Sequence, residues 1–132
     1  MLAKFVLWIT AAVLVSYGLL CFISPQVPAG YAGLQITNGD AFAEIAAMYG
    51  GLQTGVGLFC AVAACKPHYR RAGLLLLVLG IGLLACGRLY AALTSTASVS
   101  AYTHGALIYE FTTAALAGLA MRHEQQETAD AR

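Results

Sequence analysis

The chain has 132 residues, 60% of them hydrophobic and only 10% charged, and its formal net charge is +1. Soluble domains carry roughly 25% charged residues, so this composition excludes an ordinary soluble domain. A membrane-spanning helix needs about 20 mostly apolar residues, because each residue adds about 1.5 Å of rise across a hydrocarbon core about 30 Å thick. We therefore expect a polytopic membrane protein with membrane lipid as a partner and no nucleic acid.

Four apolar segments are long enough to cross a bilayer. Each is an uninterrupted run rich in Leu and Ala, which favours helices over the alternating strands of a membrane barrel. In chain order they cover residues 5–23, 41–64, 72–93 and 104–121. The predicted fold class is all-α: a four-helix transmembrane bundle that forms a single domain over residues 1–132, with a flexible tail at residues 122–132.

Basic residues outside these segments predict the orientation. None lies at 24–40 or at 94–103, the stretches that follow the first and third segments. All of them fall on the other side of the bundle, at Lys4, Lys66, Arg70, Arg71, Arg122 and Arg132. Since cytoplasmic ends carry the excess of Lys and Arg, we expect both termini in the cytoplasm and a location in the bacterial cytoplasmic (inner) membrane.

Three ionisable residues, Glu44, Arg88 and Glu110, lie inside the predicted helices. An ionised side chain at the centre of a membrane helix costs about 2.5 to 3.5 kcal/mol on insertion scales, so such residues usually face the bundle and have partners. Counted from the outer ends of their helices, they lie roughly 5, 8 and 9 Å deep at about 1.5 Å per residue. The matching depths predict one shared site, with Arg88 in salt-bridge reach of at least one glutamate.

Small and polar residues accompany these charges. Small residues recur at four-residue steps beside Glu44 and around Glu110, and such stripes let helices pack closely in lipid. The stripes are Ala43, Ala47, Gly51 and Gly55 on the second helix, and Ala106, Ala114 and Gly118 on the fourth. The polar companions at similar depth are Tyr49, Gln53, Tyr90, Tyr109, Thr113 and His104. We therefore expect a charge cluster that faces neighbouring helices rather than lipid.

Two carboxylates and one guanidinium leave a negative formal charge in a poorly solvated place. Either one glutamate is protonated, or a cation or amine from outside occupies the site. Three functions fit the cluster: a polar pocket near the outer face for a small ligand, lipid headgroup or cation; a salt-bridge latch in a structural or assembly subunit; or a small proton-coupled exporter. Such an exporter should dimerise and lack an arginine beside its acid.

Other chemistry is not indicated. Haem would need two axial ligands in the membrane core, and only His104 lies near a predicted helix. No close ligand spacing singles out a metal, and cysteines in apolar helices behave as small hydrophobes. We therefore predict no catalytic residues, no metal and no cofactor, and an enzyme is not supported. A second copy of the chain or another membrane protein is the expected partner if the glycine-rich faces serve assembly.

Several motifs resemble those of a known family. They are Ser24-Pro25 after the first helix, Glu44 followed by Tyr49-Gly50-Gly51, then Arg70-Arg71-Ala72, Gly87-Arg88 and Glu110. On these residues the chain resembles an uncharacterised family of bacterial four-helix inner-membrane proteins, catalogued as a domain of unknown function and distantly similar to DoxX-like proteins. The resemblance covers nearly the whole chain and implies the four-helix fold but no activity. Family members are often acidic and glycine-containing between helices three and four, whereas this chain has Thr94-Ser95-Thr96-Ala97-Ser98 there.

Overall fold

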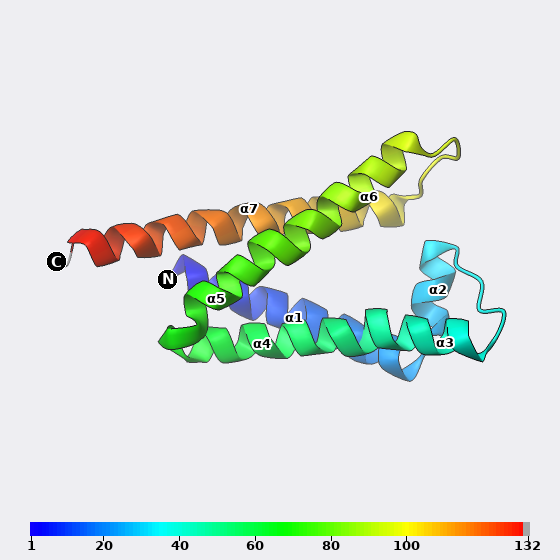
Figure 1. Cartoon of the computed structure of the whole chain (residues 1–132), viewed down its shortest axis with the longest axis horizontal. Helices are drawn as coiled ribbons and strands as arrows, with labels where there is room; N and C mark the ends of the chain where they lie inside the picture. The colour runs from blue at the N-terminus through cyan, green and yellow to red at the C-terminus, as the bar shows by residue number, and fades with distance from the viewer. Residues whose placement is uncertain (131–132) are drawn as a thin grey trace. The chain divides into compact units, whose positions relative to one another are not determined.

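The computed structural model describes the backbone of residues 1–130 and the side chains of residues 1–126. Every regular element in this range is helical, which confirms the predicted all-α class. Two π-helical segments, η1 and η2, continue α3 into α4 and α5 into α6 (Figure 1). The elements are α1 (Leu2–Ile23), α2 (Gln26–Ala32), α3 (Gly39–Ile45), η1 (Ala46–Leu52), α4 (Gln53–Cys65), α5 (Pro67–Leu76), η2 (Leu77–Ile81), α6 (Gly82–Thr94) and α7 (Ala101–Asp130).

Three continuous helices are long and apolar enough to cross a membrane: Leu2–Ile23, Gly39–Cys65 and Pro67–Thr94. They contain three of the four predicted segments and indicate a membrane protein. The fourth predicted segment, 104–121, is helical as part of α7, but α7 is more polar and does not qualify as a candidate span. A fourth crossing, and with it the four-helix bundle, stays a prediction.

The stretch at 24–40 contains the short helix α2, which was not predicted. Pro28 lies in its first turn, where backbone N–H groups have no partner within the helix and proline is tolerated. The helix ends at Gly33, whose φ of 68° lies in the left-handed region and whose N–H donates to the carbonyls of Ala29 and Gly30. A proline in the first turn and a glycine at the C-cap are therefore both compatible with a short helix here.

The basic segment between the second and third predicted helices was expected to be a loop. Most of it is helical instead. Only Lys66 separates α4 from α5. Pro67 occupies the first position of α5, where its fixed φ suits the helix and its missing N–H would have had no partner. Arg70 and Arg71 consequently lie on the first turns of α5.

The last helix also extends beyond its predicted end at residue 121. The backbone continues as helix to Asp130, where a flexible tail at residues 122–132 was expected. This extension includes an uninterrupted run of Glu and Gln at residues 124–127, and both residue types are good helix formers. Residues 131–132 lie outside the described range.

The chain divides into two compact units. Unit 1 consists of Met1–Leu7 and the chain from Ala63 onward, and unit 2 consists of Trp8–Val62. The division does not test the predicted single transmembrane domain over residues 1–132, which stays a prediction.

Unit 2 is built by close packing of α1 against η1 and α4, which run side by side (Figure 1). A Cβ added to Gly50 would come within 2.7 Å of the backbone of Phe22, and one added to Gly57 within 2.9 Å of the backbone of Val15. Side chains do not tolerate such distances, so both positions require glycine. The helices therefore approach backbone to backbone, as small residues allow in lipid.

The glycines that make this contact are not those of the predicted stripe. A Cβ added to Gly55 would have no neighbour within 4 Å, and one added to Gly51 would meet only its own helix, at 4.0 Å. The reason is η1, because a π-helical turn takes more residues than an α-helical turn and rotates everything that follows. The buried face accordingly steps by five residues, from Ile45 to Gly50.

Unit 1 packs the continuous helix α5–η2–α6 along α7 (Figure 1). Its core combines apolar side chains at helical spacing with small residues of α7; they are Leu74, Leu77, Ile81, Ala85, Ala117 and Ala120. A Cβ added to Gly82 would lie 3.6 Å from Ala114, and one added to Gly118 would lie 3.9 Å from Val78. The predicted small-residue stripe of the fourth helix therefore does face a neighbouring helix.

Candidate functional site

An ion pair between a partly exposed arginine and a buried glutamate joins α6 to α7 in unit 1. The Nε of Arg88 donates to both carboxylate oxygens of Glu110, at 3.1 Å and 3.0 Å, and Nη2 donates to Oε1 at 2.7 Å. Glu110 is only 4% exposed, and the side chain of Arg88 is 25% exposed. These are charge-assisted hydrogen bonds, and contact at both oxygens fixes the orientation of the guanidinium. The predicted contact of Arg88 with at least one glutamate is confirmed for Glu110.

Helix packing positions both side chains. Arg88 follows the buried Ala85 by three residues, so it continues the packed face of α6. On α7, Glu110 precedes the buried Thr113 by three residues and Ala114, which faces Gly82, by four. These small neighbours bring the two helices close enough for short hydrogen bonds. The geometry of the pair therefore follows from the same interface that forms the core of unit 1.

The charges of the pair depend on each other. A lone buried carboxylate or guanidinium lacks the solvation that water would give it, whereas the pair is neutral as a whole. The carboxylate of Glu110 is the more deeply buried partner, with a side chain 6% exposed. Removing Arg88 would therefore leave the charge that is harder to accommodate.

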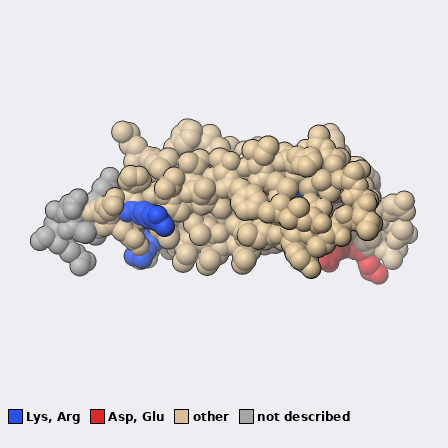
Figure 2. Space-filling model, turned by 90° about the horizontal axis from the view of Figure 1, so that it is seen from above, with Lys and Arg blue, Asp and Glu red and all other residues tan. Residues whose placement is uncertain are grey.

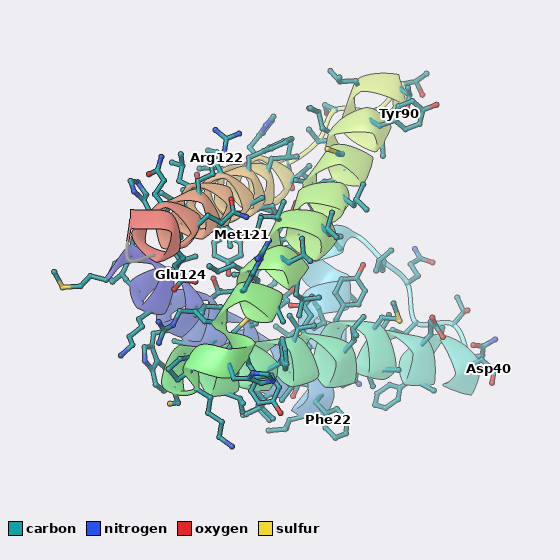
Figure 3. All side chains as sticks on the ribbon, turned by 60° about the vertical axis from the view of Figure 1, so that its left-hand side comes forward. Phe22, Asp40, Tyr90, Met121, Arg122 and Glu124 are labelled. Carbon is teal, nitrogen blue, oxygen red and sulfur yellow. The ribbon has the colours of Figure 1, made fainter. Side chains whose placement is uncertain are left out.

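The other predicted site residues of unit 1 lie around the pair in different ways. Tyr90 is 71% exposed. It lies on the opposite face of α6 from Arg88, because residues two positions apart in an α-helix point about 200° apart around the helix axis. Figure 3 shows Tyr90 directed away from α7. Tyr109 is half-buried next to Glu110 in sequence, and His104 is exposed in the first turn of α7. Tyr90 is thus not part of the contact between α6 and α7.

Three predicted site residues belong to unit 2. Glu44 is exposed on α3, Tyr49 is half-buried within η1, and Gln53 is half-buried at the first position of α4. Among the described residues Glu44 has no ion pair. The shared site that would join Glu44 to Arg88 and Glu110 stays a prediction.

Sequence reasoning missed a second ion pair, between Arg70 on α5 and Glu124 on α7. Nη1 of Arg70 lies 3.4 Å from Oε1 of Glu124. The partners are 54 residues apart, so no spacing within one helix indicates them. The only signal in the sequence is that the basic segment around Arg70 and the predicted tail after residue 121 carry opposite charges.

The described residues contain no group of three His, Cys, Asp or Glu side chains that could hold a metal ion. The described cysteines, Cys21, Cys60, Cys65 and Cys86, are free thiols. The chemistry that the pair offers is a strong and directional contact between two helices. Its partners are a permanent cation and a buried carboxylate.

The all-helical fold, with three helices long and apolar enough to span a bilayer, indicates a membrane protein. Within this class, the chain belongs to the family described as Domain of unknown function (DUF4345), whose model matches residues 2–121. The match includes both residues of the ion pair and confirms the predicted membership of such a family. The similarity to DoxX-like proteins and the bacterial origin stay predictions. No curated protein and no solved structure matches the chain.

Proposed function

We propose that this chain is a multi-pass inner-membrane protein with a structural or assembly function, in which Arg88 and Glu110 form a latch that holds α6 against α7. The observation that carries the proposal is the buried Glu110 carboxylate, both oxygens of which accept hydrogen bonds from Arg88. A carboxylate held in this way is suited to fixing a helix pair. It is poorly suited to exchanging a proton for a cation, which argues against the exporter.

The magnitudes favour a latch over an ordinary polar contact. An interhelical hydrogen bond in a membrane contributes about 0.6 kcal/mol on average. Breaking a buried ion pair by removing one partner costs about 3–5 kcal/mol, because the other charge stays buried and unpaired. The pair thereby discriminates strongly against arrangements in which α6 and α7 separate or shift along each other.

The predicted topology places this latch near the outer face. With both termini in the cytoplasm, α6 ends and α7 begins on the outer side. Arg88 lies six residues before the end of α6 at Thr94, and Glu110 nine residues after the start of α7 at Ala101. The latch would then hold the two helices where the connecting loop leaves the membrane.

The first test is equilibrium unfolding of the detergent-solubilised chain, followed by helical circular dichroism. Arg88→Met should lower the free energy of unfolding by about 3 kcal/mol, as loss of a buried partner does. Glu44→Gln is the matched control, because it removes a charge from an exposed carboxylate of the other unit. Equal stability of wild type and Arg88→Met would refute the latch.

A second candidate function is binding of a small cation or amine at Glu44. Two observations favour it: the Glu44 carboxylate is exposed without an ion pair among the described residues, and it immediately precedes the turn that leads into η1. π-helical segments within α-helices are frequent at functional sites. On this hypothesis the negative charge of Glu44 attracts the ligand, and Tyr49 and Gln53 are the first polar residues that follow it along the helix.

Titration with tetraphenylphosphonium separates the two candidates. If Glu44 forms a cation site, binding to wild type should be lost in Glu44→Gln and kept in Asp40→Asn, a variant with the same charge change one turn earlier on α3. If neither variant differs from wild type, the cation site at Glu44 is wrong and the latch is the remaining function.

A further inference from the structure

A cavity at one end of unit 1 is separate from the Arg88–Glu110 pair. It has a volume of about 400 Å³ and forms where the first turns of α1 and α5 meet the last part of α7. Two buried small residues, Ala3 and Ala120, lie in its wall and leave space that larger side chains would fill. The polar side chains that line it are Lys4, Arg70, His123 and Glu124.

The cavity is positively charged. Lys4 and Arg70 contribute two positive charges and Glu124 one negative charge, which leaves one positive charge with His123 neutral. The further basic residues Lys66 and Arg71 flank Arg70 in the chain. Figure 2 shows most of the Lys and Arg atoms gathered in one place rather than spread over the face that it draws. The cavity therefore attracts anions.

Arg70 has hydrogen-bonding capacity that its protein partner does not use. Its contact with Glu124 is a single one at 3.4 Å, long for a charge-assisted hydrogen bond. Its Nε is buried and has no hydrogen-bond partner among the described residues. A buried donor of this kind is normally satisfied, so an acceptor from outside the chain would complete the site.

Glu124 is directed toward the cavity by the geometry of α7. Arg122 and Glu124 are two residues apart and lie on opposite sides of the helix, which Figure 3 shows directly. Arg122 is exposed, whereas Glu124 is half-buried and contacts Arg70. The carboxylate of Glu124 therefore occupies one side of Arg70 as an internal anion.

The position of the cavity along the helices indicates the level of the lipid headgroups. One candidate span begins at Leu2, which lines the cavity, and another begins at Pro67, in the same first turn of α5 as the lining residue Arg70. Basic pockets between the ends of membrane helices are typical binding sites for anionic headgroups. A volume of about 400 Å³ lies within the range of small-molecule sites.

We propose that this cavity binds a phosphate group, carried either by an anionic lipid headgroup or by a small soluble phosphate. Arg70 donates to the phosphate oxygens through its guanidinium, Lys4 supplies a second cation, and His123 supplies a donor from α7. Glu124 competes with the phosphate for Arg70. The proposal is independent of the latch, because it uses none of the latch residues.

The test is ligand retention by the purified full chain in detergent, measured by native mass spectrometry. One arm adds phosphatidylglycerol with phosphatidylcholine as the neutral comparison, and the other adds glycerol 3-phosphate. Arg70→Gln should weaken binding about tenfold or more, as loss of a hydrogen bond to a charged group does. Glu124→Gln should strengthen it.

The matched control is Arg71→Gln, which removes the same charge from the exposed neighbour of Arg70. It should change binding less than about twofold, since Arg71 does not line the cavity and an exposed charge outside the site contributes little. Equal losses in Arg70→Gln and Arg71→Gln would mean diffuse attraction and overturn the proposal. The proposal would also be overturned if wild type neither preferred phosphatidylglycerol over the zwitterionic phosphatidylcholine nor bound glycerol 3-phosphate. Preference for phosphatidylglycerol alone identifies the lipid as the source, and binding in both arms identifies the phosphate group itself.

Arg70→Gln also removes an interhelical ion pair, so its effect on binding needs a second variant that leaves this pair intact. Lys4→Gln then carries the test, since Lys4 lines the same cavity but is exposed and forms no ion pair among the described residues. Circular dichroism of each variant verifies the helix content. Unchanged phosphate binding in a folded Lys4→Gln variant would show that Lys4 does not contribute to the site, and would overturn the proposed site.

Discussion

The two units of this chain hold their helices together by different means. Unit 2 brings α1 against η1 and α4 through glycines, with Gly50 and Gly57 at backbone contact distance from their neighbours. Unit 1 combines small residues with ion pairs, Arg88 with Glu110 and Arg70 with Glu124. A backbone contact that leaves no room for a side chain fixes the position of one helix on another by steric exclusion, whereas an ion pair fixes it by the geometry that satisfies both charges. The comparison suggests that register in unit 1 is fixed electrostatically and in unit 2 sterically.

The largest expected effect comes from reversing a charge in each unit. Glu110→Lys places two cations between α6 and α7, and should lower the free energy of unfolding by at least about 3–5 kcal/mol. Glu44→Lys makes the same change on an exposed residue of unit 2, and should leave the free energy of unfolding within about 0.5 kcal/mol. Unfolding in mixed micelles measures both. A comparable loss in the two variants would erase the distinction between the units.

Steric register in unit 2 is tested by adding a single methyl group. Gly50→Ala should cost about 1–3 kcal/mol, because the new Cβ would meet the backbone of Phe22. Gly55→Ala is the control, since its Cβ would have no neighbour within 4 Å. Thermal unfolding of the two variants side by side gives the difference. If Gly55→Ala were the more damaging change, the packed face of this helix would be the predicted stripe after all.

A smaller effect is expected at the start of α3. The side chain of Asn38 accepts a hydrogen bond from the backbone N–H of Ala41 at 2.8 Å. Asn38→Ala should cost about 1 kcal/mol, as is typical for loss of a helix cap. Asn38→Asp is the control, because aspartate caps equally well. Hydrogen exchange of the first turn of α3 should accelerate only in the alanine variant.

The smallest effect is expected for the ion pair at the other end of unit 1. The side chains of Arg70 and Glu124 are 19% and 28% exposed, and their contact is a single one at 3.4 Å. Glu124→Gln should therefore change the free energy of unfolding by less than about 1 kcal/mol, as partly exposed pairs do. A loss as large as that of the Arg88–Glu110 variants would show that burial does not distinguish the two ion pairs.

Much of the fold was predictable because membrane crossing imposes length and apolarity. The predicted segments 5–23, 41–64 and 72–93 all lie within the observed candidate spans. The packed face of a helix could not be predicted in the same way, because it depends on the exact number of residues per turn. The face of the second span is rotated by η1, and no residue pattern in Ala46–Leu52 specifies five-residue steps instead of four.

The site was predictable to the same degree. Insertion cost alone implies that Arg88 needs a partner, and comparison of depths along antiparallel helices predicted that at least one of Glu44 and Glu110 supplies it. Only the structure identifies Glu110 as that partner. The pairing of Arg70 with Glu124 could not be predicted. It requires α7 to continue as helix beyond residue 121 and α5 to begin as early as Pro67. The sequence places both residues outside the predicted helices, where no spacing rule relates them.

The measurement that tests the latch most directly is a double-mutant cycle on Arg88 and Glu110. Unfolding free energies are compared for Arg88→Met, Glu110→Leu and the double variant. The account predicts that each single variant is strongly destabilised while the double variant loses less than the sum by at least about 1 kcal/mol, because two apolar groups replace a pair instead of leaving one charge. Additive effects within about 0.5 kcal/mol would show that the two residues act independently and would contradict the latch.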